Sequence, residues 1–183
     1  MVGLRHLLKT TKFENPNSLS KSFSLHERQL MDMTGEYRIP ASREEVWKAL
    51  NDVEILKQCI PGCEEIEKHS ETELSAKVTA KVGPVKAKFN GKVTLSDIDA
   101  PNGYTIAGEG TGGAEGFAKG GASVILKAEG SETILSYEAK AAVGGKLAQI
   151  GSRLIDSTSK KLANQFFSNF AKALGADEEE DED

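Results

Sequence analysis

The sequence predicts one α+β domain in which a curved antiparallel sheet wraps around a long C-terminal helix. Residues 145–174 carry apolar side chains on four-residue steps from Ile150 to Leu174, with Thr158 as the one polar break, and this spacing gives a helix a wide apolar stripe. Most of residues 62–144 instead alternates apolar and polar side chains, as an antiparallel sheet with one buried face requires. Curling such a sheet around the helix buries both apolar surfaces and leaves room for a cavity between them.

The expected order of elements is β-αα-β6-α. A strand is expected at Glu36–Ile39. Ser42 and Glu45 have the spacing of a capping box, so a helix is expected to begin directly after Ser42. A second helix is expected at Val53–Cys59, and the Ile-Pro-Gly turn at residues 60–62 leads from it into the sheet.

The remaining strands are separated by turn motifs that contain glycine, proline or both. Gly83-Pro84 ends one alternating run, and the Asp-Ala-Pro-Asn-Gly segment at 99–103 precedes another. Glu129-Gly130-Ser131 closes a further hairpin. The expected strands span residues 64–68, 75–82, 85–90, 104–111, 122–126 and 133–143.

Charge is unevenly distributed along the 183 residues, whose net charge is −5. Residues 177–183 are all acidic, whereas the acids and bases of residues 31–176 nearly balance, so no basic excess points to nucleic acid. We expect residues 1–32 to be a disordered extension or an upstream start, 33–174 to form the domain, and 175–183 to be an acidic disordered tail.

Few residues in the sequence suit a metal or a catalytic site. Cys59 and Cys63 are the only cysteines, and His69 is the only histidine after residue 26. This set is too small for a zinc site and offers neither cysteine an evident base, so no metal and no catalytic residue is expected. The two cysteines and the lack of a long apolar run or signal-like segment predict a cytoplasmic protein.

Three glycines, Gly108, Gly110 and Gly113, formally match a nucleotide-binding GxGxxG motif. That motif requires a helix directly after it, and here a strand is expected to follow. Glycines in paired strands instead allow sharp curvature and leave room inside the sheet. The alternative interpretation is a mobile glycine-rich hairpin without a role in ligand binding.

Lysines recur on the polar side of two neighbouring expected strands. They are Lys77, Lys81, Lys86, Lys88 and Lys92. Such a face is either an ordinary solvated surface or a basic surface for an acidic protein or an anionic membrane.

Several segments together resemble a known family. They are EVWKALNDVEILKQCIPGCEEIE (45–67), KVGPVKAKFNGKV (81–93), the glycine series from Gly108, and GGKLAQIGSRLIDSTSKKLANQFF (144–167). This pattern resembles the CoxG family of carbon monoxide dehydrogenase subunits, within the START/Bet v1-like (SRPBCC) helix-grip superfamily. The resemblance covers about residues 33–174 and implies the helix-grip fold.

The resemblance implies a non-catalytic accessory or carrier protein for a molybdenum-containing carbon monoxide dehydrogenase-type oxidoreductase. Its role would be assembly, membrane recruitment or electron hand-off. It further implies no cofactor other than a bound quinone or lipid, and partners that include molybdenum hydroxylase subunits and transiently the inner face of the membrane. The acidic tail argues against stable anchoring on an anionic leaflet. The alternatives are a cyclase/dehydratase-type enzyme of this fold and a protein-interaction module with a solid core.

The expected cavity is lined by inward-facing strand residues and by the stripe of the C-terminal helix. Tyr104, Tyr137 and Thr158 are the candidates to orient a polar head group. The phenylalanines of the helix either line the cavity or simply pack on the sheet. The expected lining residues are Val78, Phe89, Tyr104, Val124, Leu126, Tyr137, Leu147, Ile150, Leu154, Thr158, Phe166 and Phe170.

Overall fold

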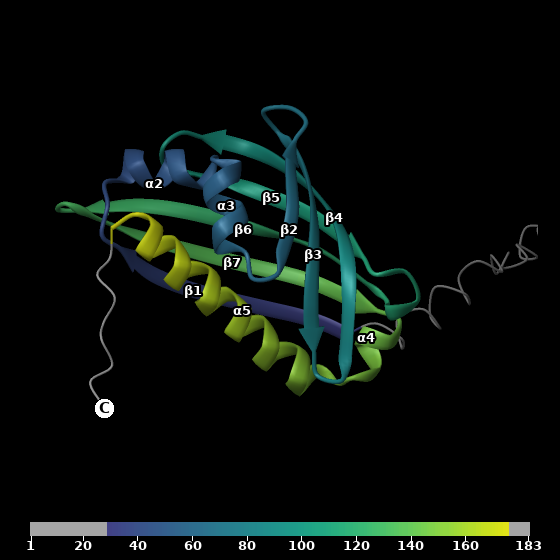
Figure 1. The fold of residues 1–183 in the computed structure, drawn as a ribbon. Coiled ribbons are helices and arrows are strands. Elements are labelled where there is room, and N and C mark those ends of the chain that lie inside the picture. The colour runs from purple at the N-terminus through teal and green to yellow at the C-terminus, as the bar shows by residue number, and fades with distance from the viewer. Residues whose placement is uncertain (1–28, 176–183) are drawn as a thin grey trace, which may run out of the picture.

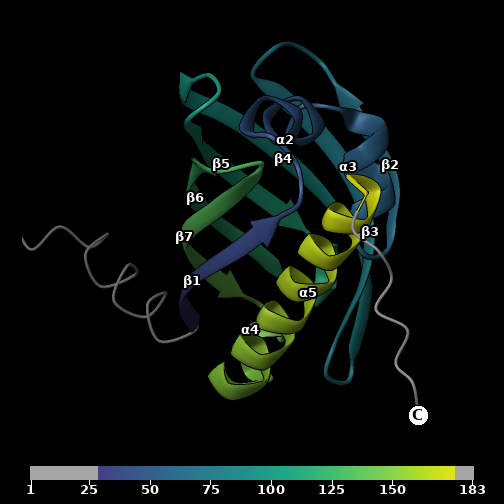
Figure 2. The ribbon, with the colours of Figure 1, turned by 90° about the vertical axis from the view of Figure 1, so that its left-hand side faces the viewer.

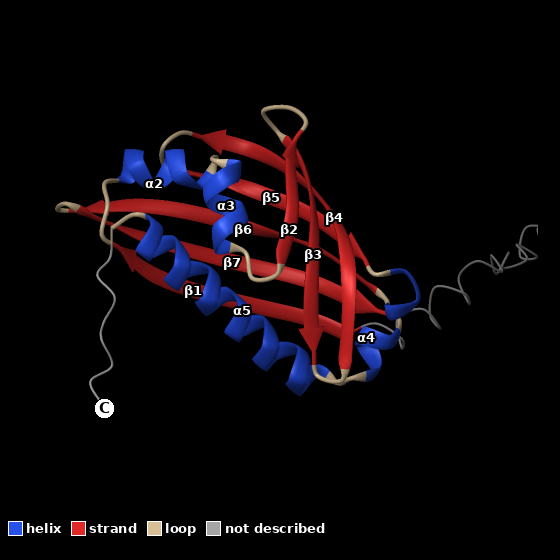
Figure 3. Cartoon of the chain, in the orientation of Figure 1, coloured by secondary structure: helices blue, strands red, loops and turns tan. Residues whose placement is uncertain are grey.

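A computed structural model describes residues 29–175 as a curled antiparallel sheet with its long helix on the concave side (Figures 1 and 3). The strands are β1 (Gln29–Ile39), β2 (Cys63–Lys68), β3 (Glu73–Val82), β4 (Val85–Asp99), β5 (Gly103–Thr111), β6 (Phe117–Glu129) and β7 (Glu132–Gly144), in the spatial order β1-β7-β6-β5-β4-β3-β2. The helices are α2 (Arg43–Leu50), α3 (Val53–Cys59), the 3₁₀ turn η1 (Gly113–Glu115), α4 (Lys146–Gln149) and α5 (Ser152–Ala173). The expected fold class is confirmed.

The first strand is longer than expected. It begins at Gln29 rather than Glu36, and it pairs with β7 from Gln29 opposite Val143 to Ile39 opposite Thr133. The folded domain therefore begins before residue 33. Pairing with β7 stabilises a segment whose own sequence gives only a weak strand signal. The rest of the expected N-terminal extension, residues 1–28, and the acidic tail from residue 176 lie outside the described residues.

The expectation of one continuous C-terminal helix is wrong. The segment forms two helices, which are separated at Gly151. This residue has a φ of +97°, a backbone conformation that residues other than glycine rarely adopt. The apolar period continues across this break because Ile150 and Ile155 both pack into the same cluster. The second helix, α5, has 22 residues and is about 33 Å long.

Helix α5 closes the curled sheet along its open side. It contacts β1 on one flank and β3 and α3 on the other, and Figure 2 shows it lying across the opening between these strands. Strands β5 and β6 therefore form the wall opposite the helix, and the space between wall and helix is the interior of the domain.

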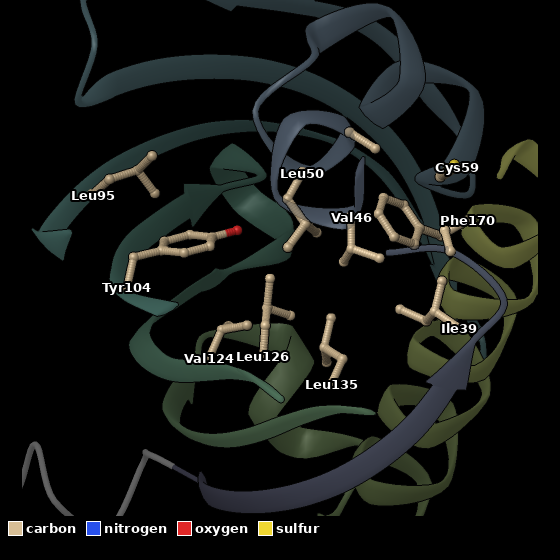
Figure 4. Packing of buried hydrophobic residues seen from close by; sticks show 12 residues of the cluster. Ile39, Val46, Leu50, Cys59, Leu95, Tyr104, Val124, Leu126, Leu135 and Phe170 are labelled. Carbon is tan, nitrogen blue, oxygen red and sulfur yellow. The ribbon is translucent and has the colours of Figure 1, made fainter. Parts of the chain in front are cut away.

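The interior contains two separate clusters of buried residues. The helical-end core lies under α2 and α3 (Figure 4) and consists of Ile39, Ala41, Val46, Ala49, Leu50, Cys59, Leu95, Tyr104, Val124, Leu126, Leu135 and Phe170. The hairpin-end core consists of Val143, Leu147 and Ile155, with Met31, Val82, Val85, Phe89, Ala118 and Ile150 packed against them. Helix α5 contributes Phe170 to the first core and Ile155 to the second, so it spans both.

The capping box at the start of α2 is confirmed, and it provides a first prediction. Ser42 Oγ accepts from Glu45 N at 3.2 Å, and Glu45 Oε2 accepts from Ser42 N at 3.2 Å. Ser42→Ala is expected to lower the free energy of unfolding by about 1 kcal/mol, measured by urea denaturation. Ser42→Asp keeps an acceptor and should stay near wild type; equal stability of all three proteins would show that the cap contributes nothing.

A candidate ligand cavity beside the C-terminal helix

The inner space next to the helical-end core contains a cavity of about 250 Å³. Residues of strands β2 to β7 supply one wall, and α2, α3 and α5 supply the other. From the sheet come Ile66, Lys68, Leu74, Ser75, Ala76, Val93, Leu95, Tyr104, Ile106, Val124 and Leu135, and from the helices and the turn after α3 come Leu50, Asn51, Leu56, Ile60, Phe166 and Phe167. This lining is almost entirely apolar.

Three of the four polar residues in this lining already have partners. Asn51 Nδ2 donates to the main-chain oxygen of Trp47 at 2.9 Å, and Ser75 Oγ lies 2.6 Å from Nε2 of His69. Lys68 stands at a partly exposed position, with its Nζ 3.6 Å from an exposed carboxylate. These groups are therefore engaged with the protein rather than directed at the cavity.

The fourth polar residue, Tyr104, is different. Its side chain is 8% exposed, and its hydroxyl makes no hydrogen bond to any residue of the described chain. Figure 4 shows the hydroxyl pointing toward Leu50 across the interior, and Trp47 packs edge-on against the ring at 5.3 Å between centroids. Among the described residues, Arg43 Nε is the one buried side-chain nitrogen or oxygen without a partner, so the Tyr104 oxygen is accessible from the cavity. The hydroxyl therefore has unused capacity to hydrogen-bond a ligand there.

Burial controls the proton on this hydroxyl. Removal from water raises the pKa of Tyr104 to about 12, because an apolar surrounding disfavours the phenolate. At neutral pH the side chain is therefore a neutral hydrogen-bond donor. It suits an acceptor such as a carbonyl oxygen, and it is a poor acid or base for catalysis.

The thiols of Cys59 and Cys63 are also poorly suited to catalysis. Cys59 is buried in the helical-end core, and burial raises its pKa. Burial likewise raises the pKa of Cys63, although Lys57 opposes the shift. Both environments are opposite to the electropositive, exposed setting of a reactive thiolate. Within residues 29–175, no cluster of His, Cys, Asp and Glu is placed to hold a metal ion.

Some of the expected cavity residues do line the cavity. Tyr104, Val124 and Phe166 lie in its wall. Leu126 and Phe170 instead lie in the adjoining helical-end core and are almost fully buried there. The phenylalanines of α5 thus divide between the two interpretations that the sequence left open, with Phe166 in the cavity wall and Phe170 in solid packing.

Tyr137 is placed elsewhere, in an aromatic stack that joins β1, β7 and α5. Its ring lies 5.7 Å from Phe167 and 6.2 Å from Tyr37 between centroids, and Tyr37 stacks on Phe167 at 4.1 Å. Tyr37 also donates to Asn164 Oδ1 at 2.5 Å. Tyr137 therefore supports the seam between the sheet and α5 rather than the cavity.

The other expected lining residues lie away from this cavity. Phe89, Leu147 and Ile150 pack in or against the hairpin-end core, because the interior divides into two clusters. Leu154 is 46% exposed. Thr158 lines a separate groove between α5 and β3.

The expected position of Val78 on the sheet is confirmed, but it is absent from the cavity lining. It lies opposite Phe89 across β3 and β4, toward the hairpin end of the sheet. Sequence reasoning missed Leu50 of α2, Leu56 of α3 and Ile60 in the turn after α3. Their apolar character was visible, but nothing local shows that these helices cover the inner space.

Gly108 and Gly110 lie in β5 and Gly113 begins η1, after which strand β6 follows, so the expectation that a strand follows the glycine series is confirmed. The five lysines share one face of β3 and β4. Lys77 pairs with Glu65 at 2.8 Å and Lys88 lies 3.6 Å from a β2 carboxylate, so β2 offsets part of their charge.

A curled sheet that grips a long helix and encloses an apolar cavity defines a helix-grip ligand-binding protein. The sequence matches, over residues 35–175, the family model of CoxG, the G subunit of carbon monoxide dehydrogenase. The chain therefore belongs to the CoxG family. No curated protein matched the sequence.

Solved structures support the same fold. A conserved protein from Geobacillus kaustophilus is 32% identical, with a TM-score of 0.74 over 79% of this chain and 95% of that one. A START superfamily protein from Mycobacterium smegmatis is 11% identical, with a TM-score of 0.61 over 78% and 96%. The ZhuI aromatase/cyclase from Streptomyces sp. R1128 is 10% identical, with a TM-score of 0.60 over 80% and 94%. The last two likenesses concern the fold alone.

Proposed function

We propose that this protein is a non-catalytic carrier that holds a quinone or a lipid in the cavity beside α5. It serves a molybdenum-containing carbon monoxide dehydrogenase-type oxidoreductase through assembly, recruitment or electron hand-off. The observation that carries this proposal is the unpaired hydroxyl of Tyr104 in a cavity whose lining is almost entirely apolar. Membership of the CoxG family supports the connection to the oxidoreductase.

The lining of the cavity suits a molecule with an apolar part and a small neutral head. Each methylene group that leaves water contributes about 0.8 kcal/mol, so an isoprenoid or acyl tail binds without many polar contacts. The Tyr104 hydroxyl supplies one directed hydrogen bond for a carbonyl oxygen. One donor and an apolar wall are sufficient to fix the orientation of such a ligand.

Two alternatives receive less support. An enzyme of the cyclase type needs an acid or base in the cavity, and within residues 29–175 its ionisable lining groups are Tyr104 and Lys68. Burial raises the pKa of Tyr104 to about 12, so the hydroxyl stays protonated at neutral pH and is not available as a base. A protein-interaction module with a solid core is disfavoured by the cavity itself.

The proposed working place is the cytoplasm, with transient contact at the inner face of the membrane to exchange ligand. Across residues 29–175, no helix is both long enough and apolar enough to cross a membrane. The proposed partners are subunits of the molybdenum hydroxylase.

Native mass spectrometry of protein purified from its own host, followed by organic extraction, tests the carrier function. A stoichiometric quinone or lipid is the expected result. A clean apo mass, together with no uptake from added quinones or lipids, would remove the basis for a carrier.

The Tyr104→Phe substitution tests the head-group contact. It is expected to weaken binding of a short-chain ubiquinone analogue about tenfold, the value of one hydrogen bond, in a fluorescence-quenching titration. The stability of the empty protein should not fall, because the hydroxyl has no partner there. Tyr137→Phe is the matched control and should leave affinity unchanged. Equal affinities for wild type and Tyr104→Phe would exclude Tyr104 as the head-group donor.

A further inference from the structure

Three inward-facing glycines lie side by side on β4 and β5 with no packing reason for their lack of a side chain. A Cβ at Gly110 would meet only Asn90 O, at 3.9 Å, and one at Gly91 only two main-chain oxygens at 3.8 Å. A Cβ at Gly108 would meet Lys92 O at 3.6 Å and a methyl group of the adjacent residue 93 at 3.8 Å. No side chain from α5 or another facing element comes within 4 Å of these positions.

Other glycines of the same sheet are explained by close packing. A Cβ at Gly120 would overlap the main-chain oxygen of Lys140, and one at Gly35 would overlap the ring of Tyr137. Glycine within a strand costs about 0.5–1 kcal/mol relative to alanine. Close packing therefore explains why Gly35 and Gly120 are glycines. It does not explain Gly91, Gly108 and Gly110, which we call the glycine floor.

The glycine floor adjoins the cavity directly. Gly91 pairs with Gly110 across β4 and β5, and Gly108 pairs with Val93, which lines the cavity. On β5 the inward positions run from Tyr104 through Ile106 to the two glycines. The strands therefore form one continuous surface from the Tyr104 hydroxyl to the glycine floor, and Figure 1 shows β4 and β5 as neighbours along it.

The length of this surface is set by the strand and by one aromatic ring. Tyr104 and Gly110 are six residues apart on β5, which corresponds to about 20 Å. Beyond Gly110, a Cβ at Gly112 would meet Phe89 Cε1 at 2.6 Å, and Phe89 packs against the hairpin-end core. The inward face of β5 thus begins at the Tyr104 hydroxyl, continues past the last residue of the cavity lining, Ile106, and ends near the ring of Phe89.

We propose that the glycine floor holds the tail of the ligand and sets its maximum length. The ligand is an amphiphile with a neutral acceptor head at Tyr104 and a linear acyl or isoprenoid tail that passes Gly108 and then Gly110 before it reaches Phe89. This inference rests on the proposed carrier function and adds selection by tail length to it. The order of the two glycines predicts a graded effect, because a side chain at Gly108 blocks the path earlier than one at Gly110.

The test uses quinones that share one ubiquinone head and differ only in the length of the isoprenoid tail. Wild-type affinity should rise with tail length and level off once the tail exceeds the surface. Gly110→Val should lower the length at which affinity levels off, and Gly108→Val should lower it further, while the shortest quinone binds both variants as it binds wild type. Each methylene displaced from the surface is worth about fourfold in affinity.

The matched control is Ala107→Val, which adds bulk to the exposed face of the same strand and should leave the length profile unchanged. Valine favours strands, so the thermal midpoints of the glycine variants should equal or exceed that of wild type. Gly110→Ala provides a smaller change if a valine variant fails to fold. The main-chain atoms of Gly91 and Gly110 also form part of a groove on the outer face, but a side chain at either position points inward and leaves that groove unchanged.

Three other outcomes separate the two proposals. An unchanged length profile in both valine variants, with Tyr104→Phe still weakening binding, overturns the glycine-floor inference and leaves the carrier function standing. An equal loss of affinity at every tail length also overturns it, because the glycines then serve overall shape and not length. Failure of wild type to bind any quinone of the series or any lipid in the extraction experiment removes the carrier function itself.

Discussion

Phe170→Ala is expected to lower the free energy of unfolding by about 3–5 kcal/mol, the range for removing a large aromatic side chain from a core. Phe170 is 0% exposed in the helical-end core, and its ring stacks on Phe166 at 5.8 Å between centroids. The substitution therefore removes buried apolar area and also leaves a hole beside the cavity wall. Urea denaturation followed by circular dichroism measures the change.

Leu154→Ala is the matched control for this prediction, because Leu154 lies on the same helix but is largely exposed. Its effect should stay within about 0.5 kcal/mol. A Phe170→Ala protein as stable as Leu154→Ala would mean that the C-terminal half of α5 is not docked on the sheet through Phe170.

Thr133→Val is expected to cost about 1–3 kcal/mol of stability despite its nearly unchanged volume. Thr133 is fully buried, and its Oγ1 donates to the main-chain oxygen of Ala41 at 2.8 Å. This bond ties the start of β7 to the segment that leads from β1 into α2. Valine fills the same space but leaves the Ala41 carbonyl oxygen without this partner in a buried site.

Thr133→Ser separates the hydrogen bond from packing. Serine keeps the hydroxyl and loses one methyl group, so a cost of about 0.8 kcal/mol is expected. Chemical denaturation of the three proteins should therefore rank them threonine, serine, valine. A valine variant more stable than the serine variant would show that packing around the methyl group outweighs the hydrogen bond.

The fold was predictable from the sequence wherever the signal is local. The capping box of Ser42 and Glu45 located the start of α2, and the bounds Val53–Cys59 of α3 were confirmed. The N-terminal part of β1 was missed because its stability comes from pairing with β7, which lies about a hundred residues away. The break at Gly151 was missed because the apolar period continues through it.

The site was less predictable than the fold. Alternation along a strand shows which face of the sheet a side chain lies on, but it does not show which part of the interior that side chain lines. Tyr104 and Tyr137 share the inward face of the sheet, and the sequence treats them alike. The structure places Tyr104 under α2, against Trp47, and places Tyr137 in the stack with Phe167. The difference depends on which helix covers each end of the sheet, and this is a tertiary property.

The two anchors of α5 make the stability of the two ends of the domain interdependent. Ile155 holds the helix to the hairpin-end core and Phe170 holds it to the helical-end core, while one rigid rod joins them. An interaction that stabilises the docking of α5 at one anchor therefore also stabilises its docking at the other anchor. A ligand seated beside Phe166 should slow amide exchange in the distant hairpin-end core without touching it, so the domain reports occupancy along its whole length.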